Sequence, residues 1–138
     1  MSILSDKKRL VLEHAAMRER WGDGARWCCD KSRTKFWWEY DVHVEGNHFP
    51  IHVVYPSDYP SSPPDIIIKA QLPKGTPHVL PRRRMCWYYP GETKRNRNVW
   101  NPSRDTAALC IGVAHRWFIA FLVWQATDEW PVPDAVSA

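Results

Sequence analysis

The stretch Tyr55-Pro56-Ser57-Asp58-Tyr59-Pro60-Ser61-Ser62-Pro63-Pro64 separates two parts of the chain that have different character. Proline fixes one backbone dihedral and lacks the N–H that a sheet ladder needs, so the strand before this stretch cannot continue through it. We expect a rigid turn here, followed by a short β-branched strand over residues 65–69.

The residues farthest upstream of this turn predict an N-terminal helix. Ser5 or Asp6 is a suitable N-cap for a helix from about Lys7 to Glu19, and Gly22-Asp23-Gly24 is a suitable end. The apolar stripe expected on this helix consists of Leu10, Leu12, Ala15, Ala16 and Met17.

Residues 27–70 are interpreted as antiparallel strands. Apolar and polar side chains alternate with period two from Phe36 to Val44, and the alternation resumes from Phe49 to Tyr55. Between these arms, Glu45-Gly46-Asn47 predicts a tight turn. With the strand near Trp27 and the strand after the proline turn, the pattern predicts a four-stranded meander.

Downstream of the meander, residues 71–102 show no sustained period and are expected to form one long loop, which in a compact domain is usually functional. Asn101-Pro102-Ser103 is expected to open a second helix, with Ser103 as its N-cap, and Asp128 to Pro131 to close it. One face of this helix carries Leu109, Val113, Trp117, Ala120, Phe121 and Trp124. The sequence thus predicts a single α+β domain over residues 1–138, with a flexible tail at 132–138.

The composition narrows the function classes. The formal net charge is +4 and 44% of the 138 residues are hydrophobic, so the chain can bury one core. No run of about 18 apolar residues predicts a membrane span, and no secretory signal is recognised, so we expect a cytoplasmic protein without a membrane partner. Nucleic-acid binding is possible on charge alone, but no nucleic-acid-binding motif supports it.

The spacing of the four cysteines predicts no zinc site and no disulfide framework, and no cofactor is expected.

Cys86 is the candidate nucleophile within the long loop. It lies eight positions after His78 and directly follows Arg82-Arg83-Arg84-Met85, and aromatic residues that include Tyr88 come after it. Cationic neighbours favour the thiolate form of a cysteine, which is the nucleophilic form. A buried structural thiol is the alternative for any lone cysteine, and Cys110, between Leu109 and Ile111 of the second helix, is expected to be one.

Taken in order, these elements resemble the ubiquitin-conjugating enzyme fold, and the match is stronger to its bacterial branch. The matching features are the proline turn, His78, Cys86 with the Tyr88–Pro90 stretch, Trp100-Asn101-Pro102, and a helix that ends in Trp124 to Trp130-Pro131. Eukaryotic members carry His-Pro-Asn before the cysteine, with an Asn that steadies the loop and the oxyanion. This chain has His78-Val79-Leu80 instead.

The resemblance implies an acyltransferase that acts through a thioester on Cys86. Stand-alone bacterial members of this kind occur beside cGAS-type nucleotide synthases in CBASS antiphage systems. The implied acyl partner is therefore a ubiquitin-like modifier or the C-terminus of a cGAS-like nucleotidyltransferase, activated by a separate enzyme. A non-catalytic binding module for a protein partner is the alternative, although such variants of the fold lack the cysteine.

The remaining candidate residues surround Cys86 in the sequence. His78 is expected to brace the cysteine loop rather than to transfer a proton. Asn101 and Asp105 are candidates for orienting an incoming nucleophile, with helix capping as the alternative. The surface expected to contact an acidic partner consists of Arg82, Arg83, Arg84 and Tyr88.

Overall fold

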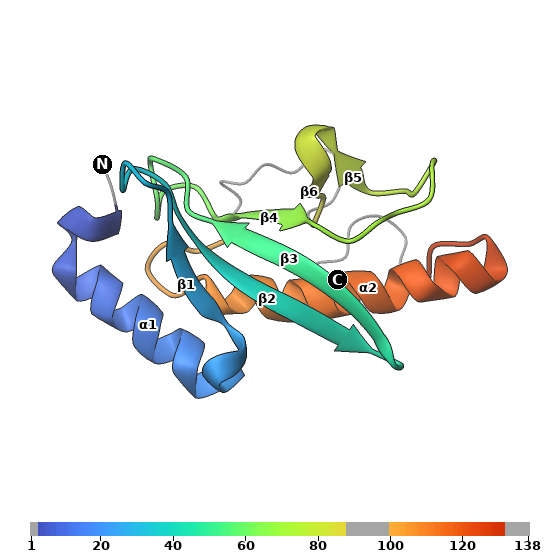
Figure 1. The fold of residues 1–138 in the computed structure, drawn as a ribbon, viewed down its shortest axis with the longest axis horizontal. Helices are drawn as coiled ribbons and strands as arrows, with labels where there is room; N and C mark the ends of the chain where they lie inside the picture. Colours follow the sequence, from blue (N-terminus) through green and yellow to red (C-terminus); the bar gives the residue numbers. More distant parts are fainter. Residues whose placement is uncertain (1–2, 88–99, 132–138) are drawn as a thin grey trace.

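The computed structural model describes residues 3–87 and 100–131 and shows two long helices and one sheet (Figure 1). Its elements are η1 (Ile3–Ser5), α1 (Lys7–Trp21), η2 (Gly22–Gly24), β1 (Arg26–Cys29), β2 (Phe36–Val44), β3 (Asn47–Val54), β4 (Asp65–Ile68), β5 (Val79–Leu80), η3 (Pro81–Arg83), β6 (Arg84–Met85) and α2 (Ala108–Thr127). The α+β arrangement expected from the sequence is confirmed.

The sheet has six strands in the order β1-β2-β3-β4-β6-β5, and every neighbouring pair is antiparallel. Strands β1 to β4 are the predicted meander. Strands β5 and β6 add a small hairpin at its edge, inside the segment that the sequence predicted to be one long loop. Each has only two residues, which is too short for a period-two pattern to be recognised.

The core lies between α2 and one face of the sheet. In Figure 1, α2 runs behind β2 and β3. Alternation along β2 and β3 turns the side chains of Trp38, Val42 and Ile51 toward α2, where all are buried. Phe49 stacks on Phe118 of α2 with ring centroids 4.2 Å apart. The other face of β2 and β3 carries polar side chains.

Helix α2 has the length and apolar composition of a membrane span, but half of its most apolar stretch is buried inside this domain. That is the situation of a core helix. The helix begins later than predicted, at Ala108, because residues 101–105 form turns instead: the backbone N–H of Asp105 donates to the Asn101 carbonyl at 2.8 Å. Ser103 lies in these turns, so its assignment as the helix N-cap is wrong.

Helix α1 packs beside β1 and contacts the start of α2, where the Trp21 indole N–H donates to the Ala108 carbonyl at 2.8 Å. Asp6 is its N-cap, as one of the two predicted choices, and Gly22 ends it. The predicted apolar stripe is only partly correct, because Leu12 is 51% exposed. Its fully buried residues are Met17 and, unexpectedly, Glu13.

Candidate active site

Cys86 directly follows a small hairpin at the edge of the sheet. In this hairpin, Val79 pairs with Met85 and Leu80 with Arg84. The backbone N–H of Cys86 donates to the His78 carbonyl at 3.0 Å, which extends the hairpin by one further link. This main-chain bond fixes the position of Cys86. The residue is half-buried, so part of it remains accessible to solvent.

The hairpin is attached to the end of β4 at two points. Arg84 pairs with Ile67 in the sheet. The Arg83 guanidinium donates from Nε to the Ile68 carbonyl at 2.8 Å and from a terminal nitrogen to the Ala70 carbonyl. These bonds hold a turn in which Arg82 and Arg83 both adopt left-handed backbone with φ of 63° and 60°. That conformation costs about 1–2 kcal/mol for a non-glycine residue, so the Arg83 contacts offset a real local strain.

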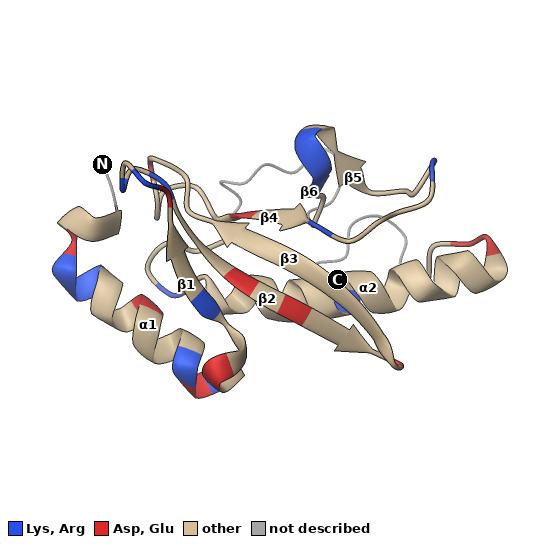
Figure 2. Ribbon diagram, viewed as in Figure 1, with Lys and Arg blue, Asp and Glu red and all other residues tan. Residues whose placement is uncertain are grey.

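The three arginines before Cys86 therefore differ in their surroundings. Arg82 is exposed and lies in η3. Figure 2 shows η3 as a basic segment above the sheet. The Arg83 guanidinium is engaged with the carbonyls of Ile68 in β4 and of Ala70 just after it. Arg84 is half-buried and donates to the Pro81 carbonyl at 3.1 Å. Tyr88, the fourth residue predicted for partner binding, lies outside the described residues.

His78 is joined to Cys86 by a hydrogen bond of the main chain. Its carbonyl accepts the Cys86 N–H, and its own φ is 59°. The imidazole packs against Trp130 with ring centroids 4.8 Å apart, and Trp130 in turn packs against the buried Trp117 of α2. Both contacts are ones that a bracing residue would make, and the bracing role stays a prediction.

Asn101 and Asp105 are engaged with their own loop. The Asp105 carboxylate accepts the Asn101 backbone N–H at 2.8 Å and a bidentate contact from Arg104 at 2.8 and 2.9 Å. Burial by itself would raise the pKa of Asp105, but these hydrogen bonds outweigh it and the pKa is lowered. The Asn101 side-chain oxygen accepts the Ser103 N–H at 3.0 Å. Both side chains thus shape the loop that leads into α2. Neither caps the helix, because its N-cap is Ala107, which has no side-chain cap hydrogen bond. Their substrate-orienting role stays a prediction.

The remaining cysteines have different environments. Cys110 is fully buried in α2, as predicted, and burial raises the pKa of its thiol well above the usual value. Cys28 and Cys29 lie on β1. Burial and the neighbouring Glu39 raise the pKa of Cys28. Among the four cysteines, Cys86 is the one that follows the edge hairpin, and its backbone N–H is hydrogen-bonded to the backbone carbonyl of a histidine.

Sequence reasoning missed the buried carboxylate of Glu13. It accepts hydrogen bonds from the Tyr55 hydroxyl at 2.8 Å, the Tyr59 hydroxyl at 2.5 Å, Arg9 Nε at 2.9 Å and the Ala107 N–H at 2.9 Å. This group joins α1, the proline turn and the start of α2. The available signal was its helical spacing, because Glu13 lies four residues before the buried Met17 and so shares its face.

The aromatic residues of the proline turn are part of the same network. Burial, together with the nearby Glu13 carboxylate, raises the pKa of both Tyr55 and Tyr59, so both hydroxyls remain donors. The Trp38 indole donates to the Tyr55 hydroxyl at 2.8 Å, and the Trp100 indole donates to the Pro60 carbonyl at 2.8 Å. The turn is thus a scaffold, as its sequence predicted.

A cavity of about 780 Å³ lies between α1 and β1, on elements that do not carry Cys86. It is lined by both apolar and charged side chains, among them Val11, His14, Arg18 and Trp27.

Comparison with known proteins relates this geometry to a family. No curated protein sequence matches the chain. Among solved structures, the crystal structure of a ubiquitin-conjugating enzyme E2 from Plasmodium falciparum is similar, with a TM-score of 0.50 and 19% identity, over 78% of this chain and 93% of that chain. This likeness concerns the fold alone. The family model described as the type II CBASS E2 protein matches residues 13–137. Because that match covers most of the chain, including Glu13, the Cys86 hairpin and all of α2, the chain belongs to the type II CBASS E2 family.

Proposed function

We propose that this protein is a ubiquitin-conjugating-like acyltransferase in which Cys86 carries the C-terminus of a protein partner as a thioester. The main observation that supports this proposal is the position of Cys86. It is half-buried, directly follows the edge hairpin, and donates its backbone N–H to the His78 carbonyl. Membership of the type II CBASS E2 family supports a role among the proteins of such a system.

The proposed reaction has two acyl transfers. In the first, the Cys86 thiolate attacks the carbonyl carbon of an activated C-terminus, a new carbon–sulfur bond forms, and the activating group leaves with its electron pair. In the second, an amine or another nucleophile attacks the thioester and the Cys86 thiolate leaves. Activation of the terminus consumes energy that the thiol cannot supply, so a separate activating enzyme provides the first acyl donor.

The partner would be a ubiquitin-like modifier or a cGAS-like nucleotidyltransferase that presents a free C-terminus. The exposed Arg82 at the tip of the hairpin would attract an acidic surface on that partner and would add to the positive field near the thiol. Arg83 would act by fixing the hairpin on β4.

The test is co-expression with a cGAS-like nucleotidyltransferase and an activating enzyme, followed by electrophoresis with and without thiol reductant. The expected result is an adduct that reductant removes and that Cys86→Ala abolishes. Cys110→Ala is the matched control and should retain it. In Cys86→Ser the adduct should become an oxygen ester that resists reductant and is cleaved by hydroxylamine.

Two outcomes would contradict the proposal. An adduct that persists in Cys86→Ala would place the chemistry elsewhere. A partner that co-purifies equally well with wild type and Cys86→Ala, without any covalent species, would establish the non-catalytic binding module instead.

A further inference from the structure

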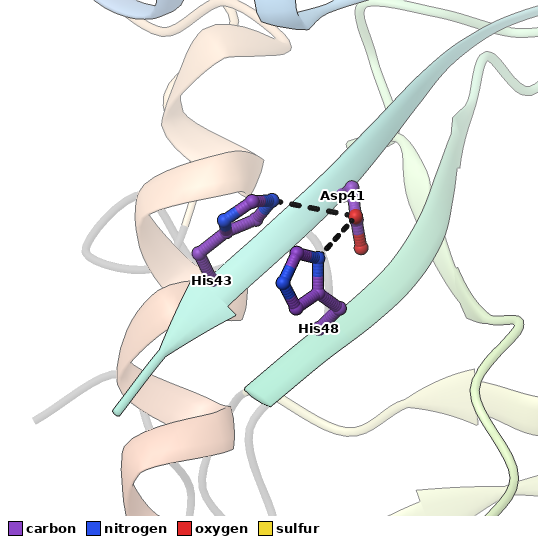
Figure 3. Close-up of side chains that lie close together, drawn as sticks. All are labelled: Asp41, His43 and His48. Atoms are coloured by element: carbon purple, nitrogen blue, oxygen red, sulfur yellow. Dashed lines mark hydrogen bonds and ion pairs between the residues drawn. The ribbon is translucent and has the colours of Figure 1, made fainter. Parts of the chain in front are cut away.

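The face of the sheet that is turned away from α2 carries histidines and carboxylates near the turn of the β2–β3 hairpin. We propose that Asp41, His43 and His48 form a surface site for a divalent cation of the zinc class, separate from the Cys86 hairpin. The three side chains converge in front of the two strands, with α2 behind them (Figure 3).

The backbone brings these side chains together. His43 and His48 are directly opposite each other in the β2–β3 register, and Asp41 lies two residues before His43, on the same face. The hairpin is closed by Glu45 and Gly46, both with positive φ, which is typical of the tight turns that fix a hairpin register. The cluster is therefore set by strand geometry rather than by a loose loop.

The distances fit the coordination shell of a small cation. Asp41 Oδ2 lies 3.0 Å from His48 Nδ1 and 3.3 Å from His43 Nε2. One ligand atom from each of the three residues lies within 4.8 Å of the others. Zinc bonds to nitrogen and oxygen of about 2.0–2.1 Å imply roughly 3.3 Å between ligand atoms of a tetrahedral site. An ion could thus be bound with only small side-chain rotations.

The ligand types select the ion. Two imidazole nitrogens and one carboxylate oxygen suit Zn²⁺, and also Ni²⁺ or Cu²⁺, whereas Mg²⁺ and Ca²⁺ require six or more oxygen ligands. Three protein ligands leave the fourth zinc position to water or to a donor group from another molecule. The side chains of Asp41, His43 and His48 are 47, 62 and 59% exposed, so an ion can enter from solvent.

The same face offers a matched control. His52 Nε2 lies 3.3 Å from Glu39 Oε2, two register positions away from the proposed ligands. Glu39 is also bound by Arg26, however, and the His52 ring stacks on Trp37 at 5.9 Å. This pair has one histidine and a carboxylate that an arginine already neutralises, so it does not provide a second site.

The test is a titration of the metal-free full-length protein with ZnCl₂, followed by calorimetry and by NMR of the histidine ring nitrogens. Cys28→Ser/Cys29→Ser/Cys86→Ser serves as the background, so that the accessible thiols do not contribute. The expected result is one equivalent of Zn²⁺ with ring shifts at His43 and His48. His43→Gln, His48→Gln and Asp41→Asn should each weaken binding by at least about tenfold. His52→Gln should bind as the background does, and MgCl₂ should give no shift.

The proposal is overturned if the background protein binds no Zn²⁺, or if its ring shifts occur at histidines other than His43 and His48. Equal weakening by His52→Gln and His43→Gln would also overturn it, because that result would indicate general attraction to the histidine-rich face. Circular dichroism of each variant shows whether the fold is retained, and the high exposure of all three side chains makes retention the expected result.

Discussion

Glu13→Ala is expected to lower the free energy of unfolding by about 3–5 kcal/mol, the usual result of removing one partner of a buried ion pair. The Glu13 side chain is 0% exposed and its Arg9 partner is 11% exposed, so water cannot easily replace the lost contacts. The Tyr55 and Tyr59 hydroxyls and the Ala107 N–H would lose their acceptor at the same time. Single domains have a free energy of unfolding of only about 5–15 kcal/mol, so Glu13→Ala would remove a large fraction of the stability of this domain.

The variant Glu13→Gln removes the negative charge of the side chain but keeps its size and shape. Glu13→Gln keeps one oxygen, which can still accept from Tyr55 and Ala107. Its amide nitrogen would face the Arg9 Nε–H, so two donors would meet there. We therefore expect a loss of about 2 kcal/mol, near the value of a hydrogen bond to a charged group.

The assay is equilibrium unfolding in urea, followed by tryptophan fluorescence, with the midpoint and slope fitted for each variant. Glu19→Gln is the matched control, because Glu19 is an exposed carboxylate on the same helix, and it should change stability by less than about 0.5 kcal/mol. Arg9→Met/Glu13→Gln should be more stable than the sum of its single changes implies, because no buried charge is left unpaired. A loss below about 1 kcal/mol for Glu13→Ala would refute the reasoning, since it would mean that the surrounding donors find other acceptors.

Two further predictions concern the cysteine hairpin and the β1–β2 loop. Arg83→Ala should sharply reduce Cys86 adduct formation while the free energy of unfolding falls by only about 1 kcal/mol, because the donors to Ile68 and Ala70 are lost but the core is intact. Normal adduct formation would contradict this positioning role. Asp30 should titrate with a pKa of about 2, followed by carboxyl carbon NMR, because the Lys35 N–H and its neighbours donate to it. A folded pKa below the unfolded value means that this stabilisation is complete above about pH 4 and is lost as the pH falls toward 2. Titration near pH 4 would show that these bonds do not form in solution.

Much of the fold could be predicted because its signals are local. Alternation over residues 36–44 depends only on which side chains face the core, and the turn at Glu45 and Gly46 depends only on neighbouring backbone angles. The second helix was recognised in the same way, but its start was not. Asn and Asp side chains bond to nearby backbone and compete with helix formation, so residue types alone did not distinguish a cap from a preceding turn.

Glu13 could not have been recognised as buried from helix α1 alone. Its hydrogen-bonding partners come from positions 42, 46 and 94 residues away in the chain, and a charged residue is interpreted as exposed unless those partners are known. The strand pair β5–β6 was missed for a different reason. It depends on two left-handed arginines and on the Arg83 contacts with β4, and neither has a sequence signature.

The loop before Cys86 is supported by backbone pairing and by contacts of His78. The position occupied by Asn in the eukaryotic His-Pro-Asn motif is Leu80 here, and Leu80 lies in β5, paired with Arg84. The loop before Cys86 is thus fixed by a sheet ladder, by the His78 carbonyl and by the His78–Trp130 contact with α2. Main-chain hydrogen bonds thus support the loop at a position where the eukaryotic motif has a side-chain amide. For the proposed acyl transfer, stabilisation of the developing charge is a separate requirement from the position of the thiol.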